Sequence, residues 1–184
     1  MKHRLIVYFV ALAPFAIVAS AAQPTSPYVG QETRDIKALS PDDLNTYLGG
    51  KGAGFAKVAE LNGYAGPAHV LELAAPLALT PEQRTRTEAL FASMESRAKS
   101  LGRALVAEER KLDRLFATKA VTPELLNSSL NEIGSLQAKV RAAHLEAHLT
   151  QVEILTPEQN ARYSKLRGYG SAGAQTGHGG QHKH

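Results

Sequence analysis

The feature that most constrains the fold is a five-residue segment, Leu-Thr-Pro-Glu-Gln, that occurs identically at residues 79–83 and 155–159. Each copy has the chemistry of a helix start. The threonine hydroxyl can accept a backbone hydrogen bond from three residues on, proline suits the first helical position, and glutamate faces the positive end of the helix dipole. The glutamine can reach back to the threonine N–H and complete a capping box. A helical protein can reuse a good cap, but two identical copies bracketing long helical segments indicate a more specific architecture.

Between the two copies, the hydrophobic pattern predicts two long helices. Residues 82–118 contain no proline and a single glycine, Gly102, and residues 122–154 begin with a looser capping signal. Apolar residues recur in both at helical spacing, although Glu108 interrupts the first stripe without an explanation from sequence. The first stripe comprises Leu90, Met94, Ala98, Leu101, Leu105, Leu112 and Leu115, and the second Leu126, Leu130, Ile133, Leu136, Val140 and Ala147. Each helix would be roughly 50 Å long, and the short turn between them predicts an antiparallel hairpin.

Short helices are expected to flank this hairpin. Four short helical segments are expected. Ser40 begins one that ends at the Gly49-Gly50 pair, and an apolar stretch at residues 55–61 forms another. Pro67 begins a third that extends to about residue 75, and the second motif begins a fourth at residues 156–167. The glycine run at residues 49–54 superficially resembles a phosphate loop. It has no serine or threonine after its lysine and no preceding strand, so a flexible turn is predicted. The predicted fold class is all-α, a long antiparallel helical hairpin with short flanking helices.

The N-terminus has the pattern of a cleaved secretory signal at residues 1–22. Residues 2–4 are basic, residues 5–18 are apolar, and Ala19-Ser20-Ala21 supplies the small residues before a cleavage site. The apolar run is shorter than the roughly 20 residues that a membrane span needs, although an uncleaved anchor is the alternative. We therefore expect an exported, periplasmic protein with no membrane span after cleavage.

The remaining chain divides into a flexible lead-in at residues 23–39, a helical domain at 40–168 and a disordered tail, rich in glycine and histidine, at 169–184. The chain has no cysteine, which excludes disulfides and thiol chemistry. Its formal charge of +4 includes Lys2 and Arg4 of the signal, and no nucleic-acid-binding motif is visible, so nucleic acid is not an expected partner. No nucleophile elbow, Rossmann glycine pattern or metal triad is found, so the protein is not expected to be an enzyme.

Two groups of histidines are candidate metal ligands. His178, His182 and His184 lie in the tail, where neutral imidazoles could capture zinc or copper, although a passive tail is the alternative. His144 and His148 are four residues apart on the second long helix, so both would point to one side and could share a metal ion. Packing of His144 in the core is the preferred interpretation of that pair. No cofactor is expected to be required.

The second long helix also has apolar residues away from its main stripe: Leu145, Leu149 and Val152. Either the short helices or a second copy of the chain must cover them, because a monomer would otherwise expose a large apolar patch. A homodimer is the prediction.

The combination of an export signal, an all-helical mature chain without cysteine, and paired Leu-Thr-x-x-Gln motifs resembles the Spy/CpxP family of periplasmic LTxxQ-motif proteins, which includes zinc-resistance-associated relatives. The resemblance extends over about residues 71–169. The matching motif positions are Leu79, Thr80, Gln83, Leu155, Thr156 and Gln159. It implies a hairpin dimer shaped as a cradle that holds unfolded envelope proteins without ATP during envelope stress. Some relatives instead restrain a sensor kinase or bind zinc.

The first long helix has a mixture of cationic and apolar residues that is compatible with weak binding of many clients. The candidate client-binding residues are Phe91, Met94, Arg97, Arg103 and Phe116. A solvated helix face is the alternative interpretation of these charges. The leading hypothesis is thus an ATP-independent periplasmic chaperone of the Spy/CpxP type. The alternative is a periplasmic metal-binding sensor or adaptor that modulates a two-component envelope-stress or heavy-metal response through the periplasmic domain of a sensor kinase.

Overall fold

The computed structural model describes residues 25–169, in which it has six helices and no strand. The described residues divide into two units, residues 25–32 and residues 33–169. The described part of the first unit is a succession of turns, and all six helices belong to the second. The helices are α1 (Pro41–Gly49), α2 (Lys57–Glu60), α3 (Pro67–Glu72), α4 (Pro81–Ala117), α5 (Pro123–Ile154) and α6 (Pro157–Leu166). The all-α prediction is confirmed.

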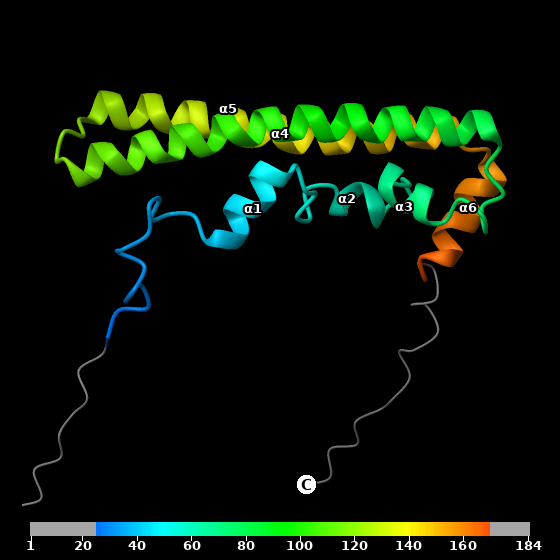
Figure 1. Cartoon of the computed structure of the whole chain (residues 1–184), viewed down its shortest axis with the longest axis horizontal. Coiled ribbons are helices and arrows are strands. Elements are labelled where there is room, and N and C mark those ends of the chain that lie inside the picture. The colour runs from blue at the N-terminus through cyan, green and yellow to red at the C-terminus, as the bar shows by residue number, and fades with distance from the viewer. Residues whose placement is uncertain (1–24, 170–184) are drawn as a thin grey trace, which may run out of the picture. The chain divides into compact units, whose positions relative to one another are not determined.

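The predicted hairpin is formed by α4, of 37 residues, and α5, of 32 residues, which lie antiparallel and side by side (Figure 1). Thr80 caps the start of α4 and Thr122 the start of α5. Between the end of α4 and the start of α5 the chain reverses direction through Lys119, whose φ of 56° is in the left-handed region. The long helices therefore begin where the capping chemistry predicts.

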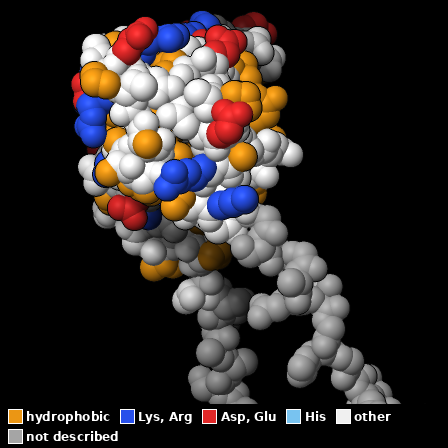
Figure 2. Space-filling view, turned by 90° about the vertical axis from the view of Figure 1, so that its right-hand side faces the viewer, with side chains coloured by type: hydrophobic (Ala, Val, Ile, Leu, Met, Phe, Trp, Pro, Cys, Tyr) orange, Lys and Arg blue, Asp and Glu red, His pale blue; other side chains and the backbone are white. Residues whose placement is uncertain are grey.

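The short helices follow one another along the hairpin, and α6 lies at the end where α4 begins (Figure 1). Helices α1 and α3 contact α4, and α2 and α3 also contact α5. α2 and α3 are shorter than their predicted segments, 55–61 and 67–75. On the end face that includes α6, charged side chains of both signs are interspersed with hydrophobic ones (Figure 2), as is usual for a solvated surface.

Three hydrophobic clusters hold this unit together. One joins α3 to α6 around Tyr163, another lies where Ile36 and Leu39 pack against α4, and the third lies between α4 and α5 around Leu105. Because Ile36 is 1% exposed, the predicted flexible lead-in at 23–39 extends too far: its last residues are packed. Ion pairs to α4 from Asp35 and Lys37 hold the same segment.

The buried face of α5 differs from the predicted stripe. Leu130 is 49% exposed, whereas the neighbouring Ser129 is fully buried. Of the apolar residues away from the stripe, Leu149 is 54% exposed, and Leu145 and Val152 are half-buried. The short helices thus cover this face only in part. None of the helices within residues 25–169 has both the length and the apolar character needed to cross a membrane.

Candidate functional site

The two Leu-Thr-Pro-Glu-Gln motifs form the capping boxes that their sequences predict. The backbone N–H of Gln83 donates to Thr80 Oγ1 at 3.1 Å, and the N–H of Thr80 donates to Gln83 Oε1 at 3.1 Å. The same two bonds occur between Thr156 and Gln159, at 3.2 and 2.9 Å. Each motif therefore fixes the start of its helix, α4 or α6.

The two glutamines also bind each other, which the sequence did not reveal. Gln83 Nε2 donates to Gln159 Oε1 at 2.7 Å, and Gln159 Nε2 donates to Gln83 Oε1 at 3.0 Å. The remaining amide hydrogens reach the carbonyls of Ile154 and Leu77, at 3.0 and 3.2 Å. The starts of α4 and α6 and the end of α5 are thus joined at one point. The sequence did contain an indirect signal for this contact. A capping box uses only the side-chain oxygen of each glutamine, so both N–H groups of that amide need acceptors elsewhere.

A cleft of about 540 Å³ lies between the hairpin and the segment that contains α2 and the start of α3. The glycine run at residues 49–54 contributes to its wall. Four residues that the sequence singled out line it: Phe91 and Met94 from α4, and His144 and His148 from α5. Its polar lining also includes Lys51, Lys57, Glu60, His69 and Glu95. This cleft is the candidate functional site.

His144 is packed in the core, as predicted from the sequence, but one of its ring nitrogens has no hydrogen-bond partner. The residue is 4% exposed, and its ring stacks on that of Phe55 with centroids 5.9 Å apart. Its Nε2 atom is buried without a hydrogen-bond partner. Burial, and secondarily the neighbouring His148, lower the pKa of His144. Its ring therefore stays neutral at physiological pH.

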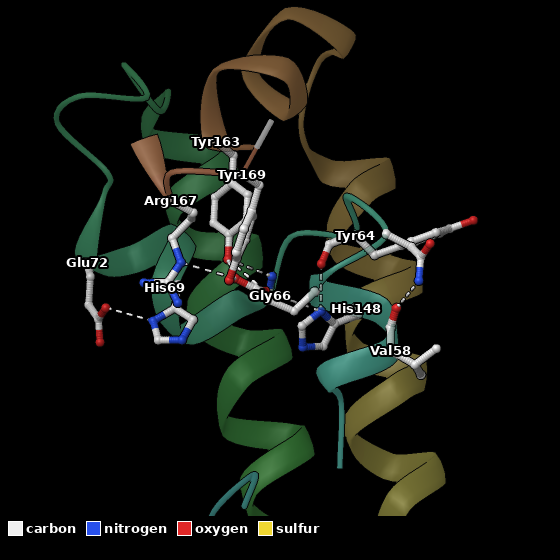
Figure 3. A network of polar contacts seen from close by, with 11 residues as sticks. Val58, Tyr64, Gly66, His69, Glu72, His148, Tyr163, Arg167 and Tyr169 are labelled. Carbon is white, nitrogen blue, oxygen red and sulfur yellow. Dashed lines mark hydrogen bonds and ion pairs between the residues drawn. The ribbon is translucent and has the colours of Figure 1, made fainter. Parts of the chain in front are cut away.

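His148 is held in a defined orientation (Figure 3). Its Nδ1 atom lies 2.8 Å from the carbonyl oxygen of Tyr64 and 4.0 Å from a carboxylate oxygen of Glu60. A carbonyl only accepts hydrogen bonds, so Nδ1 bears the hydrogen and, in the neutral ring, Nε2 bears the lone pair. Gly66 makes this placement feasible, because a Cβ atom there would lie 2.7 Å from Cε1 of the ring.

Glu60 connects the cleft wall to the C-terminal end of the described chain. Its carboxylate accepts hydrogen bonds from the hydroxyls of Tyr163 and Tyr169 and from Nε of Arg167, at 2.8 to 3.1 Å. Burial and the adjacent Glu60 raise the pKa of Tyr163, which stays a neutral donor. The network fixes the position of α6 against α2 (Figure 3). Sequence reasoning missed it because its members are about 100 residues apart.

The other predicted site residues lie elsewhere. Arg97 pairs with Glu146 across the hairpin, and Arg103 is exposed. Phe116, 55% exposed, is near the far end of α4, about 37 Å along the helix from Phe91. The five candidate client-binding residues therefore do not form one patch. The tail histidines His178, His182 and His184, like the predicted signal at 1–22, lie outside the described residues.

A sequence model of a family described as "Heavy-metal resistance" matches residues 52–162, which is more than half of the chain. The chain belongs to this heavy-metal resistance family. The match confirms the resemblance to the Spy/CpxP-like and zinc-resistance-associated group of helical periplasmic proteins. It begins in the glycine run at the cleft wall and ends within α6, so it includes both cleft histidines. No curated protein and no solved structure matches the chain significantly.

The donor atoms of the cleft suit a metal ion that imidazole binds. His144 supplies a buried, unpartnered Nε2, and His148 supplies an Nε2 whose tautomer is set by Tyr64. Neutral imidazole is the form that binds zinc, copper or nickel. Within residues 25–169, however, no three His, Asp or Glu side chains are grouped to hold a metal ion. The cleft of the heavy-metal resistance protein thus offers two nitrogen ligands of its own.

Proposed function

We propose that this heavy-metal resistance protein acts in the periplasm by binding a metal cation in the cleft through His144 and His148. The observation that carries the proposal is the pair of buried imidazoles on one wall of the cleft, with Nε2 of His144 unpartnered. Leaving a buried polar atom unpaired costs about 1–3 kcal/mol. A ligand role for that nitrogen accounts for the cost. Such a protein would serve as a metal-binding sensor or adaptor in a two-component heavy-metal response.

The surroundings of the two histidines support this role. The lowered pKa of His144 keeps protons from competing for its nitrogen at neutral pH. The Tyr64 carbonyl accepts a hydrogen bond from Nδ1 of His148 and orients the ring, in the way that outer groups commonly orient metal-binding histidines. The thioether of Met94 lines the same cleft, and thioethers favour copper(I) over zinc. Zinc and copper are therefore the cations to examine.

The proposal is tested by titrating zinc and copper into the mature chain with isothermal calorimetry. The variant His144→Phe/His148→Gln keeps the packing volume and a donor toward Tyr64, and we expect it to bind at least tenfold more weakly. Asn131→Ala, an exposed polar change on the same helix, is the matched control and should bind like wild type. Unchanged affinity in the double histidine variant would overturn the metal role of the cleft.

A second candidate function is the ATP-independent chaperone. The observation that favours it is that Phe91 and Met94 line the cleft, which gives an apolar wall with an adaptable methionine. The test is suppression of aggregation of several denatured clients without nucleotide. Phe91→Ser/Met94→Ser should weaken protection, whereas Phe116→Ser, a change outside the cleft, should not. Absence of protection by the wild-type chain would exclude this function.

A further inference from the structure

The two cleft histidines, His144 and His148, supply only part of the ligand set that a bound metal ion needs. Structural zinc sites use four ligands, and zinc sites that keep an open position still use three from the protein. Within residues 25–169, no third His, Asp or Glu is grouped with these two to hold a metal ion. His69 also lines the cleft, but its Nδ1 is engaged by Glu72 at 2.8 Å (Figure 3). A tetrahedral ion on the two cleft histidines therefore has two positions open to a further ligand.

The cleft is much larger than those two positions require. Two water molecules occupy about 60 Å³ in the liquid, whereas the cleft has a volume of about 540 Å³. Sites for small organic molecules typically have roughly 300–1,000 Å³ and a largely apolar lining. Phe91, Met94 and Ala147 line this cleft from the hairpin. It thus has the size and the apolar wall of a site for a small organic molecule.

Two lysines of the cleft lining have no anionic partner. Lys51 and Lys57, the cleft lysines, are exposed, and neither forms an ion pair within the part of the chain that the structure describes. Each ammonium carries N–H donors on a flexible stem. Carboxylates are strong acceptors for such donors, because both groups are charged. The lining therefore offers two cationic donors to an anionic ligand.

The charge balance of the cleft disfavours a bare metal cation. The carboxylate of Glu60 is already paired with Nε of Arg167, at 3.1 Å. That of Glu95 is paired with Nζ of Lys99, at 3.0 Å. The ammonium groups of the cleft lysines are thus an excess of positive charge, and a divalent ion alone would increase it. A ligand with carboxylates would offset this charge and occupy the open coordination positions.

We propose that the cleft binds its metal ion as a complex with a small carboxylate chelator, in which the cleft histidines complete the coordination and the cleft lysines bind the carboxylate. This inference rests on the proposed metal-binding function and names the form in which the cation is bound. The chelator is a hydroxy acid or an amino acid. One carboxylate oxygen and the adjacent hydroxyl or amino group fill the two open positions, and the remaining carboxylate oxygens accept hydrogen bonds from the lysines.

Equilibrium dialysis of the full mature chain tests whether metal and chelator bind together. Radiolabelled citrate represents the hydroxy acids and L-histidine the amino acids, and histamine is L-histidine without its carboxylate. We expect about one carboxylate chelator per chain with zinc and at least tenfold less without it, because the metal joins the chelator to the protein. Retention of citrate or of L-histidine identifies the preferred class. If zinc stays without either chelator, if both remove it from the chain, or if histamine is retained equally well, the proposal is wrong.

The role of the cleft lysines is tested by Lys51→Met/Lys57→Met, which keeps the length of both side chains and removes their charge. This variant should retain at least tenfold less chelator, because the charged hydrogen bonds to the carboxylate are lost. Zinc alone should bind to it no more weakly than to wild type. The matched control is Lys139→Met/Lys165→Met, which makes the same change in net charge at exposed lysines outside the cleft. Equal retention by the two double variants would overturn the role of the lysines.

The variant His144→Phe/His148→Gln distinguishes failure of this inference from failure of the proposed function. It keeps every other histidine of the chain and should lose zinc and chelator together. If it binds zinc alone as well as wild type does, the metal role of the cleft is wrong. If it loses zinc, but wild type binds zinc without retaining a chelator, the metal role stands and only the chelator is wrong. Circular dichroism checks that the histidine and lysine variants remain helical.

Discussion

At the scale of single residues, the contact of α1 with the hairpin depends on Gly102. A Cβ atom at this position would lie 2.0 Å from the carbonyl oxygen of Tyr47, so the backbone of α1 rests directly on α4. Glu108, the other irregularity in the α4 stripe, is a polar contact between the long helices. Its carboxylate accepts from Ser129 Oγ of α5 at 2.9 Å and from Lys111 at 2.8 Å. These hydrogen bonds, chiefly that of Lys111, lower the pKa of Glu108.

Gly102→Ala should therefore destabilise the protein although alanine is the better helix former. Overpacking typically costs about 1–3 kcal/mol, which exceeds the gain in helix propensity of about 1 kcal/mol. The matched control is Gly134→Ala on α5, where nothing lies within 4 Å of the added methyl group. Urea unfolding should give a lower free energy of unfolding for the first variant and a higher one for the second. Equal stabilisation by both changes would mean that α1 is not held at Gly102.

His144 gives the unfolding free energy a defined pH dependence. Its folded pKa is lowered, chiefly by burial, so below the unfolded pKa near 6.5 the unfolded chain binds the proton more readily than the folded one. Stability that is present above pH 6.5 is thus lost as the pH falls toward the folded pKa. Urea unfolding of wild type and His144→Phe should be measured at several pH values between 8 and 5. The unfolding free energy of wild type should fall more steeply with decreasing pH than that of the variant. An equal decrease in both proteins would show that His144 is not protected from protons in the folded state.

At the scale of elements, the two motifs act as one junction between helices. Each glutamine caps its own helix and binds the other glutamine, so Gln83 and Gln159 share hydrogen bonds that either substitution removes. Thr122 caps α5 without such a pair. The junction also fixes where α6 lies, and with it Tyr163 and the Glu60 network at the cleft. The repeat thus supports the candidate site from a distance.

The costs of Gln83→Ala and Gln159→Ala should consequently be non-additive. Once one glutamine is lost, the second no longer has its partner, so the double variant should be more stable than the sum of the single changes predicts, by about 0.5–3 kcal/mol. Thr122→Ala should cost about 1 kcal/mol and add to either glutamine change, because it lies at the opposite end of the hairpin. The measurement is a double-mutant cycle by chemical denaturation. Additive glutamine costs would mean that their mutual hydrogen bonds contribute nothing.

The starts of the helices could be predicted from sequence, and the packing between them only in part. A cap is local chemistry, so Ser40, Thr80, Thr122 and Thr156 begin their helices as expected. The face of α5 that is buried depends on what packs against it. Leu130 fits the apolar period but is 49% exposed, whereas the neighbouring Ser129 is buried and donates a hydrogen bond to Glu108 of α4.

The candidate site, like the fold, could be predicted from the sequence only in part. The four-residue spacing placed His144 and His148 on one side of α5, and the contacts of both histidines agree with it. The opposing cleft wall includes five glycines, which have no side-chain pattern to read, and Glu60 meets Tyr163 across 103 residues of sequence. Glycines in a cleft wall and a network of distant residues could not be found by periodicity or spacing.

At the scale of the whole molecule, the short helices bury the apolar side chains of the hairpin only in part. Leu149 on α5 is 54% exposed, Val58 on α2 is 51% exposed, and Leu61, which follows α2, is 56% exposed. Burying apolar side chains of this size yields about 25 cal/mol for each Å² removed from water. A second copy of the chain is the partner that the sequence analysis predicts for this face.

We therefore expect the mature protein to be a homodimer held in part by Leu149. Light scattering coupled to size-exclusion chromatography should give about twice the monomer mass at micromolar concentration, and Leu149→Gln should shift the population to the monomer because an unpaired amide would be buried at the interface. Leu130→Gln is the matched control, since this leucine is equally large, 49% exposed and on the same helix, but lies about five turns away. If Leu130→Gln dissociates the dimer and Leu149→Gln does not, the interface is near the turn of the hairpin. If wild type is already a monomer at this concentration, α2 and α3 cover enough of the apolar face to make a partner unnecessary.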